Sequence, residues 1–115
     1  MKGRLYSKFL SDLVTIYRKE AQQDEFGGEK SGWVRKYWEV KARIYGASGG
    51  YKITVDGNEY GITHKGIMNR DTDVVAGDKI TNYDTGFSYV VLRVYVLKQT
   101  KKTHHIELLL SGIQE

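Results

Sequence analysis

The sequence predicts an all-β protein: a small antiparallel β-barrel of six or seven strands with a protruding, glycine-hinged hairpin. Short segments rich in β-branched and aromatic residues recur along the chain and alternate with polar residues. Between them lie turns that depend on Gly, Asp and Asn, because the chain has 13 Gly and no Pro. No segment has a clear helical period, and 115 residues fit one domain spanning 1–115.

The first predicted strand covers residues 12–20 (DLVTIYRKE), with Val14 and Ile16 on one face. Leu13, Thr15 and Tyr17 occupy the other face, so both faces could be covered. A polar stretch with three glycines follows at 21–32 (AQQDEFGGEKSG), and its composition predicts a flexible loop or arm.

The clearest alternating strand is predicted over residues 33–45 (WVRKYWEVKARIY). One face carries Val34, Trp38, Val40, Ala42 and Ile44, interrupted by Lys36. The other carries Arg35, Tyr37, Glu39, Lys41, Arg43 and Tyr45. About a dozen residues is long for a strand and is typical of a strongly curved one, as in a small barrel.

Residues 46–63 predict a hairpin that protrudes from the barrel. Asp56-Gly57 lies between two strand-like arms, 51–55 and 59–63, and this dipeptide favours a tight turn with positive φ. Each five-residue arm would extend about 17 Å at ~3.3 Å per residue. The side chains that we expect to contact a partner or a channel are Tyr51, Lys52, Thr54, Asp56, Gly57, Asn58 and Tyr60.

The rest of the chain predicts three more strands. The outgoing arm continues to Arg70, a turn covers 71–78, and a short strand covers 79–83. Next come a turn at 84–86, a strand at 87–98, a turn at 99–103 and a final strand at 104–110. In the strand 87–98 we expect one shared face for Val90, Leu92, Val94 and Val96, and in the last strand we expect Ile106, Leu108 and Leu110 to point inward.

Few residues in the sequence suggest a catalytic site or a metal-binding site. The absence of cysteine excludes disulfides, thiolate metal sites and cysteine catalysis. His104 and His105 point to opposite faces of one strand, so they are poor joint ligands for one metal ion, and only one of them could form a site with His64 and an Asp. Asp71, Asp73 and Asp78 only loosely resemble a calcium loop, and no Gly-rich phosphate motif or nucleophile elbow surrounds Ser48. The sequence therefore predicts no enzyme, cofactor or metal.

The charge distribution leaves room for acidic partners. The net charge is +4, residues 1–45 hold ten Lys/Arg and six Asp/Glu, and residues 71–92 hold one Lys and four Asp. Such a chain could pair head-to-tail with copies of itself. Basic and aromatic residues also interleave at Arg35, Lys36, Tyr37, Arg93 and Tyr95, which suggests a DNA-facing or interface surface and an OB-like platform for single strands. No apolar run approaches the ~20 residues of a transmembrane helix, and the first residues do not predict a signal peptide.

Several short segments, taken in order, resemble a known family. They are WEVKARIY (38–45), ITHKGIMNR (62–70), AGDKI (76–80), FSYVVLRV (87–94) and HHIELLL (104–110), preceded by DLVTIYRKE. Together they span about residues 10–111 and resemble the head-completion proteins of tailed bacteriophages, also called head–tail connectors, head-closure proteins or stoppers. The family often has a helix or long excursion where this chain has the hairpin 46–63.

The resemblance implies a structural β-barrel protein of the phage neck, with no catalysis and no cofactor. Copies would form a homo-oligomeric ring, six- or twelve-fold, between the portal or adaptor protein and a tail completion or tail tube protein. The ring would help close the channel, touch packaged DNA without sequence specificity and reside in the virion after assembly in the host cytoplasm. No membrane is implied.

Three other functions stay open from the sequence. A tail-completion or terminator protein would share the assembly role but use other surfaces. An OB-like protein that binds single strands would need four residues on one face, namely Arg35, Tyr37, Arg93 and Tyr95. A small enzyme would need His64 or His105 near a carboxylate in a pocket. The hairpin also has two possible roles. It could swing into a DNA channel on Gly46, Gly49 and Gly50, or it could be a surface hairpin that extends the barrel sheet.

Overall fold

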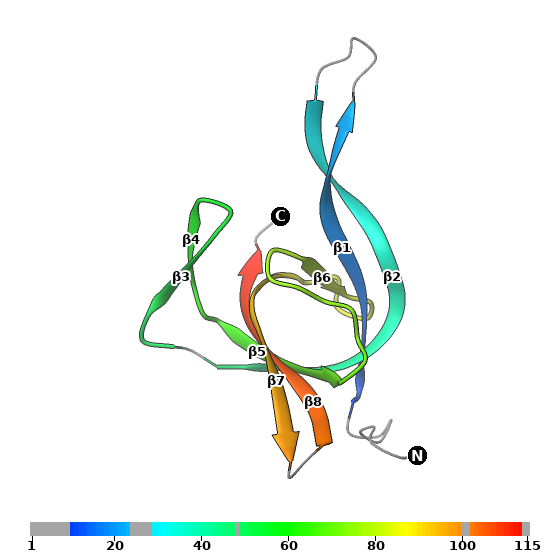
Figure 1. Ribbon diagram of the computed structural model, residues 1–115, viewed down its shortest axis with the longest axis vertical. Helices are drawn as coiled ribbons and strands as arrows, with labels where there is room; N and C mark the ends of the chain where they lie inside the picture. Colours follow the sequence, from blue (N-terminus) through cyan, green and yellow to red (C-terminus); the bar gives the residue numbers. More distant parts are fainter. Residues whose placement is uncertain (1–9, 24–28, 48, 100–101, 114–115) are drawn as a thin grey trace.

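The fold is a closed antiparallel barrel with a hairpin beside it. The computed structural model describes residues 10–23, 29–47, 49–99 and 102–113, and those residues form eight strands and no helix. Six strands close the barrel in the order β1-β2-β5-β8-β7-β6, while β3 and β4 form a separate two-stranded sheet (Figure 1). The prediction of a small all-β barrel is confirmed. The strands are β1 (Asp12–Gln23), β2 (Glu29–Gly46), β3 (Lys52–Val55), β4 (Asn58–Gly61), β5 (His64–Asn69), β6 (Lys79–Asn82), β7 (Ser88–Gln99) and β8 (Lys102–Ile113).

A two-stranded ribbon of β1 and β2 extends beyond the barrel (Figure 1). β1 pairs with β6 only as far as Tyr17, whereas its pairing with β2 continues to Gln23↔Glu29. The predicted flexible loop 21–32 is therefore wrong at both ends: 21–23 and 29–32 are paired strand. The strand pairing continues because two neighbouring polar strands can satisfy each other's backbone groups without a core beneath them. Residues 24–28 lie outside the described chain.

A β-bulge interrupts β2 and corrects the predicted face of Trp38. Between Val14↔Val40 and Ile16↔Tyr37, the single residue Thr15 faces both Trp38 and Glu39. Glu39 has a φ of 56°, the left-handed value that lets an extra residue fit into a strand. The bulge breaks the alternation, so Trp38 is 61% exposed instead of facing inward. Beyond it Ala42 is fully buried, as predicted.

The barrel interior holds the main core. The segment between β5 and β6 crosses one end of the barrel and inserts Val74, which is 5% exposed, among the side chains of the strands. Backbone hydrogen bonds from Gly77 N–H to Val91 O and from Val91 N–H to Asp78 O, both 2.8 Å, fix the same segment to β7. The buried members of this core are Val14, Ile16, Ala42, Met68, Val74, Ile80, Tyr89, Val91, Ile106, Leu108 and Leu110.

A second core lies outside the barrel, between the hairpin and strands β7 and β8. Ile53 and Ile62 from the hairpin segment pack there against Val90, Leu92 and Leu109. Strands β7 and β8 therefore carry apolar residues on both faces, as strands that are covered on both sides do. This core seats the hairpin against the outer surface of the barrel, so the hairpin does not extend the barrel sheet.

A register shift in β7 corrects another predicted face. Between Val91 and Arg93 the pairing with β8 slips by one residue. Before the slip Val91 points into the barrel, and after it Val94 packs against the same core. Val90 and Leu92 lie in the outer core, so the four valine and leucine residues predicted to share one face do not share it. Val96 is 58% exposed.

Other local predictions are confirmed. The hairpin turn has positive φ at Asp56 (50°) and Gly57 (79°), as a two-residue turn of the predicted type requires. The inward positions of Ile106, Leu108 and Leu110 are also as predicted. The predicted turn 99–103 is shorter, because β7 extends to Gln99 and pairs there with Lys102.

Candidate interaction surfaces

The hairpin presents one face to solvent and one to the barrel. Lys52 and Thr54 are exposed on the outer face, where the Lys52 ammonium lies 3.5 Å from the Glu59 carboxylate. The turn residues Asp56, Gly57 and Asn58 are exposed, and Tyr51 at the base is 56% exposed. Tyr60 is paired with Ile53 and packs against the outer core. The predicted contact set thus lies together on one hairpin, except that Tyr60 faces inward.

The base of the hairpin is fixed and does not form a free hinge. Ala47 N–H donates to Thr63 O (3.0 Å), and Thr63 N–H donates to Leu110 O of β8 (2.9 Å). A Cβ at Gly49 would lie 2.7 Å from Ile62 Cδ1, so this glycine permits close packing. Burial of the five outer-core side chains contributes at least about 1.5 kcal/mol each, or about 7 kcal/mol together. Swinging the hairpin away would have to break this outer core, so the structure supports a docked hairpin.

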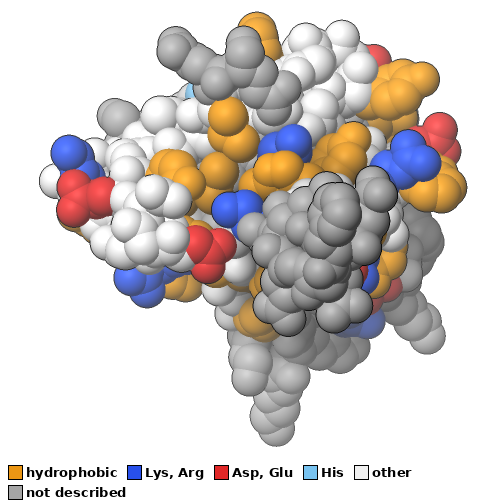
Figure 2. Space-filling model, turned by 90° about the horizontal axis from the view of Figure 1, so that it is seen from above, with side chains coloured by type: hydrophobic (Ala, Val, Ile, Leu, Met, Phe, Trp, Pro, Cys, Tyr) orange, Lys and Arg blue, Asp and Glu red, His pale blue; other side chains and the backbone are white. Residues whose placement is uncertain are grey.

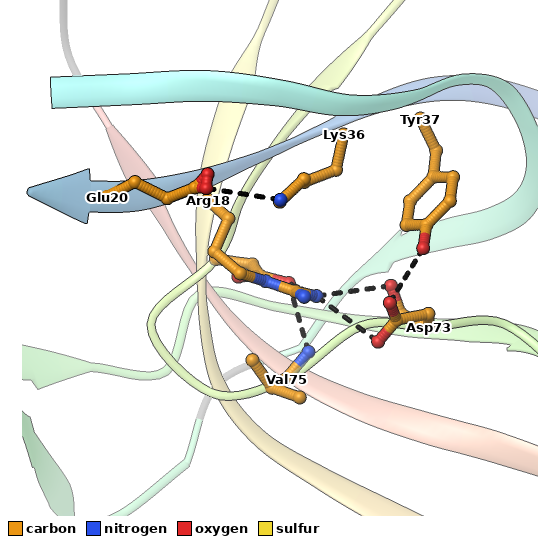
Figure 3. Close-up of polar contacts among 7 residues, drawn as sticks. Arg18, Glu20, Lys36, Tyr37, Asp73 and Val75 are labelled. Atoms are coloured by element: carbon orange, nitrogen blue, oxygen red, sulfur yellow. Dashed lines mark hydrogen bonds and ion pairs between the residues drawn. The ribbon is translucent and has the colours of Figure 1, made fainter.

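Polar side chains tie the segment before β6 to the ribbon (Figure 3). Arg18 of β1 donates from Nε and Nη2 to the two carboxylate oxygens of Asp78, both at 2.9 Å. Asp78 is 1% exposed and also accepts the Val75 N–H at 3.0 Å. Arg18 Nη2 donates to Asp73 Oδ1 at 3.3 Å, and the Tyr37 hydroxyl donates to Asp73 Oδ2 at 2.7 Å. We call Arg18, Tyr37, Asp73 and Asp78 the arginine cluster.

The arginine cluster shows what two aspartates bind, for which the sequence suggested other roles. Asp73 and Asp78, which loosely resemble part of a calcium loop in the sequence, bind a guanidinium. Two of the four aspartates in the acidic stretch 71–92 are thereby neutralised within the chain, which weakens the expected head-to-tail charge pairing. Among the residues that the structure describes, no three His, Asp or Glu side chains are placed to bind a metal ion.

The contact between Tyr37 and Asp73 should make stability depend on pH at both extremes. The Tyr37 hydroxyl, helped by Arg18, lowers the pKa of Asp73 below its usual 3.8, while Asp73 raises the pKa of Tyr37 above its usual 10.0. A lowered carboxyl pKa stabilises the fold above pH 3.8, and this stabilisation is lost as the pH falls. A raised phenol pKa stabilises it below pH 10.0, and this is lost as the pH rises.

We therefore expect Tyr37→Phe to be less stable than the wild type between pH 3.8 and pH 10.0, with a deficit that shrinks as the pH falls below 3.8 or rises above 10.0. Urea unfolding of both proteins at each pH measures the difference. Tyr83→Phe, at a tyrosine that is 70% exposed, is the control and should match the wild type throughout. A Tyr37→Phe deficit that stays constant from neutral pH to both the acid and the alkaline extreme would contradict the contact.

The residues of the predicted OB-like platform do not share a face. Arg35, Lys36 and Tyr37 lie on β2, whereas Arg93 and Tyr95 lie on β7, three steps away in the closed order of six strands. Lys36 forms an ion pair with Glu20 at 3.1 Å, and Tyr37 belongs to the arginine cluster. Arg93 and Tyr95 instead line a groove of about 430 Å³ between β7 and the hairpin. The platform fails because barrel closure places β2 and β7 on opposite sides.

A different row of aromatic and basic side chains crosses β6, β1 and β2. Lys79 Nζ lies 4.9 Å from the centre of the Tyr17 ring and 5.2 Å from that of Trp33. Lys19 Nζ also lies 5.2 Å from Trp33, and the Arg35 guanidinium lies 4.5 Å from Trp38. We call these six residues the basic strip: Tyr17, Lys19, Trp33, Arg35, Trp38 and Lys79. Sequence reasoning found only Arg35, because the pairing of β6 with β1 that brings in Lys79 is not visible in the sequence.

The histidines have structural neighbours. The His64 ring meets Tyr89 edge-on at 4.8 Å, and its Nδ1 lies 2.8 Å from the Thr63 hydroxyl oxygen. Gly112 N–H donates to that same hydroxyl at 2.8 Å, which joins β5 to the end of β8. His105 Nε2 lies 3.9 Å from a Glu107 oxygen on β8. Neither histidine lines the groove beside the hairpin; Ser48 and the side chain of His104 lie outside the described residues.

Comparison with known proteins gives no relative: no protein-family model matches the chain, and no curated protein matches it. In the described part of the chain, no helix has the length and apolar character needed to cross a membrane.

Proposed function

We propose that the chain is a structural protein of the bacteriophage neck. In this role copies form a ring below the portal and adaptor, help to close the DNA channel and present the surface on which the tail docks. The proposal is supported by the order of the segments that resemble head-completion proteins. They fall in β2, in β5, in the segment leading into β6, in β7 and in β8, which with β1 make up the closed barrel.

The observation that carries the proposal is the docked hairpin. Its inner face is buried with Ile53 4% and Ile62 6% exposed, while Tyr51, Lys52, Thr54 and the turn stay exposed. A surface that is already ordered before binding loses little entropy when a partner docks. The hairpin therefore suits a permanent assembly contact, and it would meet a neighbour or the channel as a fixed projection.

The unpaired edge of β2 offers a second surface through which copies could associate into a ring. This strand pairs with β5 only through Ala42–Gly46, so on that side the part from Glu29 to Lys41 has no strand neighbour among the described residues. Unpaired strand edges readily accept a strand from another chain. Because the paired part of the barrel is closed, this edge and the hairpin are two of the places where β-pairing between copies can occur.

The experiment uses heads from the phage that encodes this chain, made without it. We expect such heads to lose DNA and to lack tails, and we expect added wild-type protein to restore tail attachment in electron micrographs. A hairpin variant, Tyr51→Ala with Thr54→Asp, should lower the tailed fraction at least tenfold. Tyr83→Ala removes a tyrosine that is 70% exposed in the β6–β7 turn and serves as the matched control.

Two outcomes would overturn the proposal. Heads made without the chain could already carry tails and infect, which excludes a neck role. Alternatively, the chain could bind isolated tails and never heads, which would identify a tail-completion or terminator protein. A deficit that is equal for the Tyr83→Ala control would remove the hairpin from the contact surface.

A further inference from the structure

The groove between β3 of the hairpin and β7 has an apolar floor and a charged rim. Its volume of about 430 Å³ falls within the roughly 300–1,000 Å³ that ligand sites in proteins have. Ile53 and Leu92, which are 4% and 2% exposed, form the floor, and the half-buried Val55 and Val94 flank it. The other residues that line the groove are exposed: Thr54, Asp56, Ala76, Arg93 and Tyr95.

Two free strand edges border this groove. Among the described residues β3 pairs only with β4, and no residue of β4 lines the groove, so the free edge of β3 faces it. Ala76, which precedes β6, marks the side of β7 that faces the groove; on that side β7 pairs with β6 at residues 88–90, and no described strand pairs with it beyond Leu92. Unpaired backbone groups on a strand edge accept an added strand. An extended segment in the groove can therefore pair with either edge and place every second side chain on the apolar floor.

Opposite charges stand on the two walls of the groove. Asp56 belongs to the hairpin wall and Arg93 to the β7 wall, and neither forms an ion pair or a hydrogen bond with any residue in the described part of the chain. A guanidinium favours a carboxylate that it can bind through two hydrogen bonds, and a carboxylate favours a basic group. Figure 2 shows hydrophobic side chains beside acidic and basic ones at the end of the molecule from which the hairpin turn projects. The groove is thus complementary to a chain that carries charges of both signs.

We infer that this groove binds an extended peptide segment of a partner protein, in which apolar residues alternate with polar ones that include an acidic and a basic residue. The apolar residues cover Ile53 and Leu92, the acidic residue pairs with Arg93, and the basic residue pairs with Asp56. In this mode of recognition the backbone hydrogen bonds supply affinity, and the side-chain contacts supply specificity. Binding costs little ordering of the protein, because the outer core already seats the hairpin.

This inference goes beyond the neck proposal and is tested without it. Peptide binding is measured on the isolated chain, whereas the neck role is measured on heads and tails, so either can fail alone. If both hold, the segment belongs to the neighbouring neck protein that docks at the hairpin.

The test measures the fluorescence anisotropy of labelled seven-residue peptides in which Val alternates with polar residues. One Asp and one Lys occupy each possible pair of the polar positions in turn, and Thr fills the others. At least one arrangement should bind the wild-type chain with a Kd of about 100 µM or below. Arg93→Gln and Asp56→Asn should each raise that Kd about five- to tenfold, since each removes one charged partner at an exposed site. Asn at position 56 keeps a residue type that tolerates the positive φ of the turn.

Two further variants test the pairing and the place. Arg93→Glu should abolish binding of the selected peptide and restore it when Lys replaces the Asp of the peptide. Ala76→Trp fills the groove from an exposed position without changing the charge, and it should block binding. Arg35→Gln is the matched control: it removes an equal charge on β2, across the barrel, and should change the Kd less than about twofold. Circular dichroism confirms that each variant is folded.

Three outcomes would overturn the inference. Every peptide of the panel could fail to bind below about 1 mM. Binding could survive both Arg93→Gln and Ala76→Trp, which would place it at another strand edge such as that of β2. Arg35→Gln could weaken binding as much as Arg93→Gln, which would show an effect of net charge only.

Discussion

Arg18→Met is expected to lower the free energy of unfolding by about 3 kcal/mol. The substitution leaves Asp78, which is 1% exposed, with the Val75 N–H and without the guanidinium that supplied two hydrogen bonds of 2.9 Å. A buried carboxylate that loses its partner is more costly than the pair itself is stabilising. Because the Arg18 side chain is 25% exposed, we take the low end of the range for buried pairs. Urea unfolding at pH 7 measures the change.

Two further variants show whether the arginine cluster is responsible. Arg18→Lys keeps the charge but loses the planar fork, so its loss should be about half as large. Adding Asp78→Asn to Arg18→Met should recover part of the stability, since the buried charge is then removed as well. A loss below about 0.5 kcal/mol for Arg18→Met, the range of ordinary surface changes, would contradict the contact.

Leu109→Ala is expected to lower the free energy of unfolding by about 3 kcal/mol, although Leu109 points out of the barrel. It is 5% exposed because the hairpin covers it together with Val90 and Leu92. Truncation removes buried apolar area and leaves a cavity beneath the hairpin. Chemical denaturation and the thermal midpoint measure the effect.

The neighbouring β7 supplies the control. Val96 is 58% exposed, so Val96→Ala should change stability by less than about 0.5 kcal/mol. A similarly small effect of Leu109→Ala would mean that the hairpin is not docked in solution. In that case the fixed hairpin surface on which the neck proposal depends would also be lost.

The barrel could be predicted because its signals are local. Asp56-Gly57 marks its turn through positive φ, and the alternation through Ile106, Leu108 and Leu110 marks a strand with one face inward. Such patterns depend only on residues that are close in the chain. The strand segments, the type of the hairpin turn and most of the inward-facing positions follow from these local patterns.

The faces of Trp38 and of β7 could not be predicted, because irregularities in the strand pairing interrupt the alternation of side chains locally. Glu39 has a φ of 56°, but neither its residue type nor its neighbours in the sequence indicate a positive φ at this position. Leu109 presents a different problem, since its burial requires a hairpin more than 45 residues earlier in the chain. A sequence pattern predicts that an apolar residue is buried, but not which element covers it.

The candidate sites were predicted least well, because barrel closure decides which side chains meet. Arg35 and Arg93 have similar aromatic neighbours in the sequence yet lie on opposite sides of the barrel. Lys79 and Trp33 are far apart in the chain but meet because β6 closes against β1. Asp73 and Asp78 look like metal ligands until the position of Arg18 is known.

Strands β7 and β8 serve both cores at once, and this has a mechanical consequence. A pull on the hairpin passes through Ile53 and Ile62 to Val90, Leu92 and Leu109, and so to the ladder that joins β7 to β8. That ladder runs from Ser88↔Ile113 to Gln99↔Lys102, and force directed along it must shear many hydrogen bonds together. A load applied at the hairpin would therefore be resisted by the whole barrel before any single element yields.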